Sequence, residues 1–98
     1  MKLNLQQLKE DANHPLTFKT ISQGPCLYQS FHNGYFISIV PGETGYNVFL
    51  WNEFLGLIAL VAFDVEPEEV DSVIDDFYHK TQTLSMDDFL NLNAQGKE

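Results

Sequence analysis

The Asn33-Gly34 dipeptide constrains the fold of this chain more than any other local feature. It interrupts a stretch of β-forming residues that runs from Cys26 to Val40 (CLYQSFHNGYFISIV). Asn and Gly tolerate the positive φ angles that both central positions of a type I′ turn require, so this stretch is predicted to form a β-hairpin with a two-residue loop. The predicted register has four cross-strand pairs: His32 with Tyr35, Phe31 with Phe36, Ser30 with Ile37, and Tyr28 with Ile39.

Further strands are expected on either side of this hairpin. Residues 16–23 alternate in a way that is typical of a half-exposed strand, and Gly24-Pro25 ends it. Residues 46–51 (YNVFLW) are rich in β-forming residues and follow a loop that contains Pro41 and Gly42. Strands that follow one another closely in sequence usually pair as neighbours, so a meander of three or four strands is predicted.

Residues 52–63 (NEFLGLIALVAF) are compatible with either a strand or a helix. Leu and Ala dominate the segment, its β-branched residues are Ile58 and Val61, and Asn52 is placed to cap a helix. A helix is therefore favoured over a central strand. The segment is apolar on every side, so we expect it to be buried on more than one face. Its exposed end is a candidate contact for a homodimer.

Helices are predicted at both ends of the chain. The first is expected to start after Asn4, which can cap it while Gln7 completes a capping box, and to end before Pro15. The second is expected to start at Pro67, because proline is favoured at the first position of a helix. A single apolar stripe runs along this second helix: Val70, Val73, Ile74, Phe77 and Tyr78. A short final helix is expected from Ser85.

These elements predict one α+β domain over residues 1–98, with residues 93–98 as a frayed tail. The expected architecture is an N-terminal helix, a three- to four-stranded antiparallel β-meander, and C-terminal helices packed on one face. Cys26 is the single cysteine, which favours a reducing compartment. The longest apolar run, residues 54–63, is about half of the ~20 residues that a membrane-spanning helix needs. We therefore expect a cytoplasmic protein with no membrane partner.

Negative charge is concentrated in the last third of the chain. Residues 64–98 contain ten acidic and two basic residues, whereas residues 1–63 contain four acidic and three basic residues. A field of one sign steers cationic surfaces toward it. The predicted partner-binding residues are the acids of the two C-terminal helices: Glu68, Glu69, Asp71, Asp75, Asp76, Asp87 and Asp88. Within the longer helix, Asp76 is expected to pair with Lys80 and Asp75 with His79.

The sequence lacks the motifs of the common catalytic and cofactor-binding sites. It has no HxxxH, CxxC, EF-hand, GxSxG or glycine-rich phosphate-binding pattern, and it contains no arginine. Cys26 is expected to be a small buried hydrophobe. The aromatic residues of the hairpin are expected to lie in the core, because a nucleic-acid platform needs a basic groove and the net charge is −9. No catalytic residue, metal ligand, cofactor or nucleic-acid partner is therefore predicted.

The leading hypothesis is a small, acidic, non-enzymatic protein-interaction module. Its acidic C-terminal helix would bind a basic protein surface, as an inhibitor, an immunity protein or a nucleic-acid mimic does. The alternative is a small-ligand-binding domain or accessory subunit, with a pocket between the sheet and residues 52–63. In that case the acids would serve solubility alone.

Overall fold

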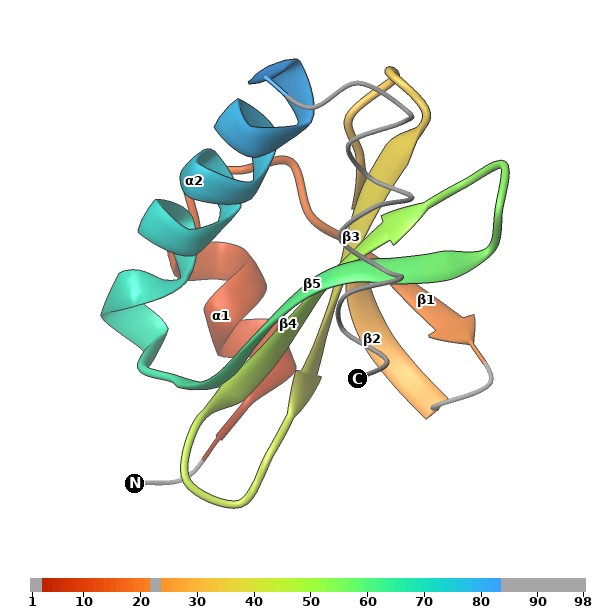
Figure 1. Ribbon diagram of the computed structural model, residues 1–98. Coiled ribbons are helices and arrows are strands. Elements are labelled where there is room, and N and C mark those ends of the chain that lie inside the picture. The colour runs from red at the N-terminus through yellow and green to blue at the C-terminus, as the bar shows by residue number, and fades with distance from the viewer. Residues whose placement is uncertain (1–2, 22–23, 84–98) are drawn as a thin grey trace.

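The computed structural model describes residues 3–21 and 24–83. Its elements follow one another in this order: α1 (Leu5–Asp11), β1 (Thr17–Ile21), β2 (Gly24–Ser30), β3 (Tyr35–Pro41), β4 (Tyr46–Asn52), β5 (Leu57–Val65), the 3₁₀ helix η1 (Pro67–Glu69) and α2 (Val70–Thr83). The five strands form one antiparallel sheet in the order β1-β2-β3-β4-β5. Both α-helices lie on the same face of this sheet (Figure 1). The predicted α+β meander is confirmed, with one strand more than expected.

The core lies between this sheet face and the helices. Alternate residues of the central strands are fully buried there, because successive side chains of a strand point to opposite faces. The sheet contributes Leu27, Ile37, Ile39, Val48 and Leu50, and the helices contribute Leu8, Val70, Ile74 and Phe77. The apolar stripe predicted for α2 is thus confirmed as its packing face, although Tyr78 at the edge of the stripe is 44% exposed.

The hairpin is confirmed, but its predicted register is wrong by one residue. The strands pair Leu27 with Ile39, Tyr28 with Ser38, Gln29 with Ile37 and Ser30 with Phe36. The loop has three residues, and the Phe31 N–H donates to the Tyr35 carbonyl across it at 3.0 Å. Positive φ angles occur at His32 (58°) and Gly34 (90°), so the loop is not the expected type I′ turn.

Burial explains the observed register. A shift of one residue exchanges the two faces of a strand relative to its partner. The three-residue loop places Phe31 on the same face as Tyr35 and Ile37, and all three are buried. The two-residue loop would have put Phe31 beside Phe36, on the face opposite Ile37 and Ile39. Contacts of Asn33 also stabilise the longer loop, since its amide accepts from the Tyr35 N–H and donates to Thr81 of α2.

The helix predicted for residues 52–63 is also wrong, because residues 57–65 form strand β5. The local signal at Asn52 is nevertheless real: its side chain accepts a hydrogen bond from the Leu55 N–H, and its carbonyl accepts one from the Gly56 N–H. This single helical turn stops at Gly56, whose φ angle is +63°. The chain then reverses, and β5 pairs with β4 from Leu57 onward. As an edge strand, β5 is partly exposed rather than buried on several faces.

The predicted cap of the first helix is confirmed. Asn4 is the N-cap of α1, and its side chain accepts from the Gln7 N–H at 3.1 Å. The reciprocal half of the capping box is replaced by a long-range contact, because the Asn4 N–H donates to the Tyr46 hydroxyl at 2.8 Å. That hydroxyl in turn donates to the Asn4 carbonyl at 3.0 Å. Tyr46, which is buried at the start of β4, therefore joins the first helix to the sheet.

The final short helix predicted from Ser85, together with Asp87, Asp88 and the expected frayed tail, lies outside the described residues. The described part of the chain contains no helix long and apolar enough to cross a membrane.

We expect Tyr46→Phe to lower the free energy of unfolding by about 1–3 kcal/mol, because the Asn4 N–H loses its acceptor and the Asn4 carbonyl, which also accepts from the Leu8 N–H, loses one of its two donors. Chemical denaturation measures the change. Tyr28→Phe is the control, since the Tyr28 hydroxyl makes no hydrogen bond within the described residues. Equal stability of the two variants would contradict a structural role for the Tyr46 hydroxyl.

Candidate partner-binding surface

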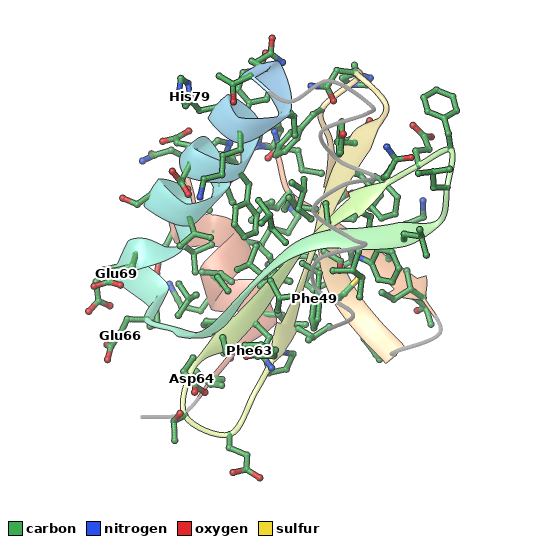
Figure 2. The ribbon with its side chains drawn as sticks, in the orientation of Figure 1. Phe49, Phe63, Asp64, Glu66, Glu69 and His79 are labelled. Carbon is green, nitrogen blue, oxygen red and sulfur yellow. The ribbon has the colours of Figure 1, made fainter. Side chains whose placement is uncertain are left out.

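The acids of η1 and α2 lie on the side of these helices that faces away from the core. We call this group, Glu68, Glu69, Asp71, Asp75 and Asp76, the acidic surface. Burial of Val70, Ile74 and Phe77 against the sheet determines this orientation, because residues between them on the helix must point outward. Figure 2 shows Glu69 projecting from the body of the molecule beside Glu66.

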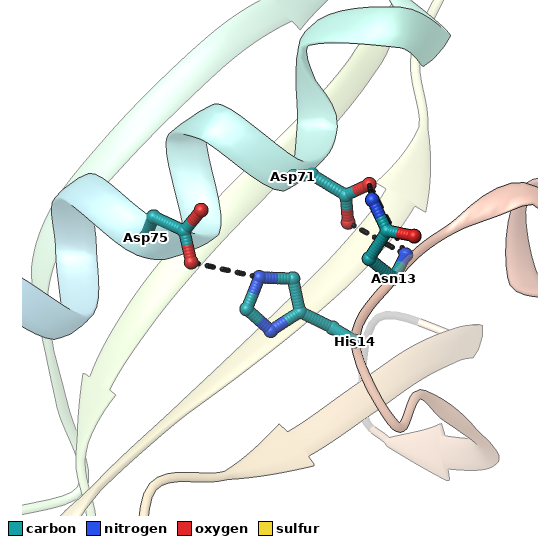
Figure 3. A network of polar contacts seen from close by, with 4 residues as sticks. All are labelled: Asn13, His14, Asp71 and Asp75. Atoms are coloured by element: carbon teal, nitrogen blue, oxygen red, sulfur yellow. Dashed lines mark hydrogen bonds and ion pairs between the residues drawn. The ribbon is translucent and has the colours of Figure 1, made fainter.

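Asp71 binds the segment that joins α1 to β1. The backbone N–H of Asn13 donates to both carboxylate oxygens of Asp71 at 3.1 Å, and the Asn13 side-chain amide donates to Oδ2 at 3.2 Å (Figure 3). The backbone N–H of Asn13, which lies just beyond the end of α1, thus donates to a charged acceptor. Asp71 therefore stabilises the fold in addition to carrying surface charge.

Asp75 pairs with His14, and the expected pairing with His79 is wrong. The Asp75 carboxylate lies 3.0 Å from Nε2 of His14, in the same loop as Asn13 (Figure 3). The His14 side chain is only 18% exposed, so packing already restricts it and the pair loses little side-chain entropy. The other predicted pair is confirmed, with Lys80 Nζ 3.1 Å from Asp76.

The remaining acids of this surface lack such partners. Within residues 3–21 and 24–83, no cationic side chain lies within ion-pair distance of Glu68 or Glu69. Two acids that precede them extend the negative charge toward β5. Asp64 accepts a hydrogen bond from the Thr44 hydroxyl at 2.8 Å, and Glu66 is exposed. These two residues were not among the predicted partner-binding residues, although they belong to the same acid-rich run.

A pocket of about 370 Å³ lies between the end of α1 and the start of α2. Its lining residues are Asp11, Ala12, Pro67, Glu68 and Asp71. Three of these five residues are acidic, so the pocket is a concave part of the acidic surface. Asp11 joins it through the tertiary fold, and nothing in the local sequence around Asp11 could have indicated this.

A second pocket, of about 350 Å³, lies between α2 and the hairpin. Its lining residues are His14, Gln29, Ser30, Phe31, His32, Asp75 and Tyr78. The ligand pocket expected between the sheet and residues 52–63 is a different arrangement, and it does not form because β5 belongs to the sheet itself. In the described part of the chain, no three His, Cys, Asp or Glu residues are grouped as metal ligands would be.

Cys26 is buried in β2, as the sequence predicts. Burial raises the pKa of its thiol, and the nearby Lys19 ammonium opposes that effect. A buried thiol with a raised pKa is a poor nucleophile at neutral pH.

The aromatic residues divide between the two faces of the sheet. Phe31, Tyr35 and Tyr46 are buried in the core. Phe36 instead stacks on Trp51 on the opposite face, with ring centroids 5.9 Å apart. The expectation that the hairpin aromatics all lie in the core is therefore wrong for Phe36. The Tyr28 ring lies 5.2 Å from that of Phe36, and Lys19 Nζ lies 4.1 Å from the centroid of the Tyr28 ring.

Comparison of the chain with protein-family models, with curated proteins and with solved structures gave no match.

Asp71 and Asp76 are expected to differ in their effect on stability. Asp71→Ala should lower the free energy of unfolding by about 1–2 kcal/mol, because Asn13 loses a charged acceptor. Asp76→Ala should cost about 0.3–0.5 kcal/mol, since its pair with Lys80 is exposed and local. Urea denaturation of both variants tests this, and a larger loss for Asp76→Ala would contradict it.

Cys26 is expected to resist alkylation in the folded protein. Its thiol pKa is higher in the folded chain than in the unfolded chain, so folding keeps the thiol protonated. The associated stability is fully present below the ordinary thiol pKa and is lost as the pH rises beyond it. Iodoacetamide should therefore modify the native protein much more slowly than the urea-unfolded control at neutral pH. Equal rates would contradict the burial of this thiol.

Proposed function

We propose that this protein is a non-enzymatic interaction module whose acidic surface binds a basic protein surface. The observation that carries the proposal is the uncompensated charge at the start of η1 and α2. Glu68 and Glu69 are exposed there without a cationic neighbour in the described part of the chain. Electrostatic complementarity of this kind accelerates association and selects partners by charge.

The acidic pocket gives this surface a shape as well as a charge. A lysine or arginine side chain of the partner fits the chemistry of a concave site lined by Asp11, Glu68 and Asp71. An arginine could bind a carboxylate through two parallel hydrogen bonds, whereas a lysine would act as a point charge. Asp71 already accepts three bonds from Asn13, so Asp11 and Glu68 are the residues with more capacity to bind the incoming cation.

Small-ligand binding is a second candidate function, and the second pocket supports it. Gln29 lines this pocket, and its buried Oε1 atom has no hydrogen-bond partner among residues 3–21 and 24–83. A buried acceptor without a donor costs about 1–3 kcal/mol, and a ligand with an N–H or O–H group would remove that cost. Binding there would depend little on salt, because the carboxylate of Asp75 is already paired with His14.

The experiment is a pull-down from a lysate of the organism that encodes the chain, with the protein immobilised at low and at high salt. The wild type should retain a basic protein at low salt and release it as the Debye length falls from about 10 Å at 0.1 M to 3 Å at 1 M. Glu68→Gln/Glu69→Gln should abolish retention, because it removes the unpaired charges and leaves the Asp71 and Asp75 contacts with the loop intact.

Glu53→Lys is the matched control. It changes the net charge by the same two units but lies in the turn between β4 and β5, away from α2 (Figure 1). Retention by this control, together with loss in the double variant, supports a defined acidic site. Equal loss of retention in both variants would mean that net charge alone, and not a defined site, causes the binding. A partner whose retention is unaffected by salt and by both variants would overturn the proposal.

A further inference from the structure

Strand β5 forms one edge of the sheet, and no other strand among residues 3–21 and 24–83 pairs with its outer side. It is nine residues long, from Leu57 to Val65. Within the described residues, positions 57–63 make no backbone hydrogen bond outside the ladder with β4. An edge strand presents a row of free N–H and C=O groups, which is a template for pairing with another strand.

The two edges of the sheet differ in how they are protected against such pairing. Natural edge strands are usually short, or they carry lysine, proline or inward-pointing charges. The β1 edge has both features, since it is five residues long and carries Lys19 at its centre. The β5 edge is nine residues long, and its first seven residues, 57–63 (LIALVAF), contain no charge and no proline; its one charged residue, Asp64, stands next to its end. The β1 edge is thus the better protected of the two, although register shifts interrupt the β4–β5 ladder at two places.

Exposed apolar side chains accompany this open edge. Phe63 is 67% exposed and Leu57 is 44% exposed. Phe54, in the turn that leads into β5, is 78% exposed. Burial of apolar surface contributes roughly 25 cal/mol per Å² removed from water. A partner strand along this edge would cover part of these side chains and satisfy the free backbone groups together.

We propose that β5 pairs antiparallel with β5 of a second copy of this chain, which joins two sheets into one. An antiparallel pair of identical strands is self-complementary, because each donor of one copy meets an acceptor of the other under two-fold symmetry. Pairing uses up the open edge of each copy. The protected β1 edges remain at the outside, so the assembly closes as a dimer and does not grow into a fibre.

Charge placement also favours an antiparallel second copy. Each chain carries a net charge of −9, so two copies repel unless their acids lie apart. The negative charge lies at the C-terminal end of β5 and beyond it, at Asp64 within the strand and at Glu66 and η1 after it. When the two strands pair antiparallel, the acidic residues of one copy and those of the other lie at opposite ends of the joined strands. With about 3.3 Å per residue, seven paired residues separate them by more than two Debye lengths at physiological salt.

Sedimentation equilibrium over a concentration series tests the proposal. The wild type should move from 11.2 kDa toward twice that mass as its concentration rises. Phe63→Lys should raise the dimer dissociation constant at least about tenfold, because it places a charge on the open edge. Phe18→Lys is the control, since Phe18 is a half-exposed phenylalanine on the β1 edge and its replacement makes the same charge change.

Far-UV circular dichroism establishes that each variant is folded. If Phe63→Lys fails to fold, Leu57→Lys at the other end of the strand replaces it with the same expected result. Monomeric wild-type protein at every concentration would overturn the proposal. Weakening by Phe18→Lys as great as that by the β5 variants would overturn it too, because the contact would then not be specific to β5.

Salt separates this proposal from the binding of a basic protein. Added salt screens the repulsion between the two acidic copies, so the dimer should persist or strengthen. The same salt should weaken the binding of a basic partner to the acidic surface. Failure of one proposal therefore leaves the other standing, since Phe63→Lys leaves the acidic surface intact and Glu68→Gln/Glu69→Gln leaves β5 intact.

Discussion

Packing of the α2 stripe on the sheet is the constraint from which the rest of the molecule's surface follows. Val70, Ile74 and Phe77 are almost completely buried, and a helix that buries one stripe must expose the opposite one. The acids of the helix therefore point outward. Asp71 and Asp75, on the side toward α1, contact the loop at Asn13 and His14. Glu68 and Glu69, in η1, are exposed to solvent. One apolar contact thus decides both where the negative charge lies and which carboxylates remain available to a partner.

Local signals in the sequence identified most elements, whereas their pairing depended on tertiary contacts. Asn4 marked the start of α1 correctly, whereas Pro67 opens the 3₁₀ helix η1 and the predicted α-helix begins three residues later, at Val70; capping and proline geometry act within one turn. Asn33-Gly34 located the hairpin, yet the register followed from burial of Phe31 and from the contact between Asn33 and Thr81, 48 residues away. Residues 57–65 became a strand because Gly56 ends the turn at Asn52 and β4 offers a free edge. Composition alone contains neither fact.

The same distinction applies to the candidate surface. The sequence located the acids and the pair between Asp76 and Lys80, which are four residues apart on one helix. It could not indicate that Asp71 would bind Asn13, 58 residues away, or that Asp75 would prefer His14 to His79. These partners are brought together when the loop after α1 folds against α2. The acidic pocket and its residue Asp11 are consequences of the same approach, so they became visible with the structure.

These long-range contacts also determine which part of the acidic surface has most to gain from a partner. Like charges three or four residues apart, such as Glu68, Asp71 and Asp75, destabilise a helix by about 0.2–0.5 kcal/mol per pair. Asn13 and His14 offset that cost at Asp71 and Asp75 within the folded chain. Glu68 and Glu69 receive only the smaller benefit of the helix dipole at their position in the first turn. A cation supplied from outside would therefore be bound most favourably at the start of η1, beside the acidic pocket, and less so along the middle of α2.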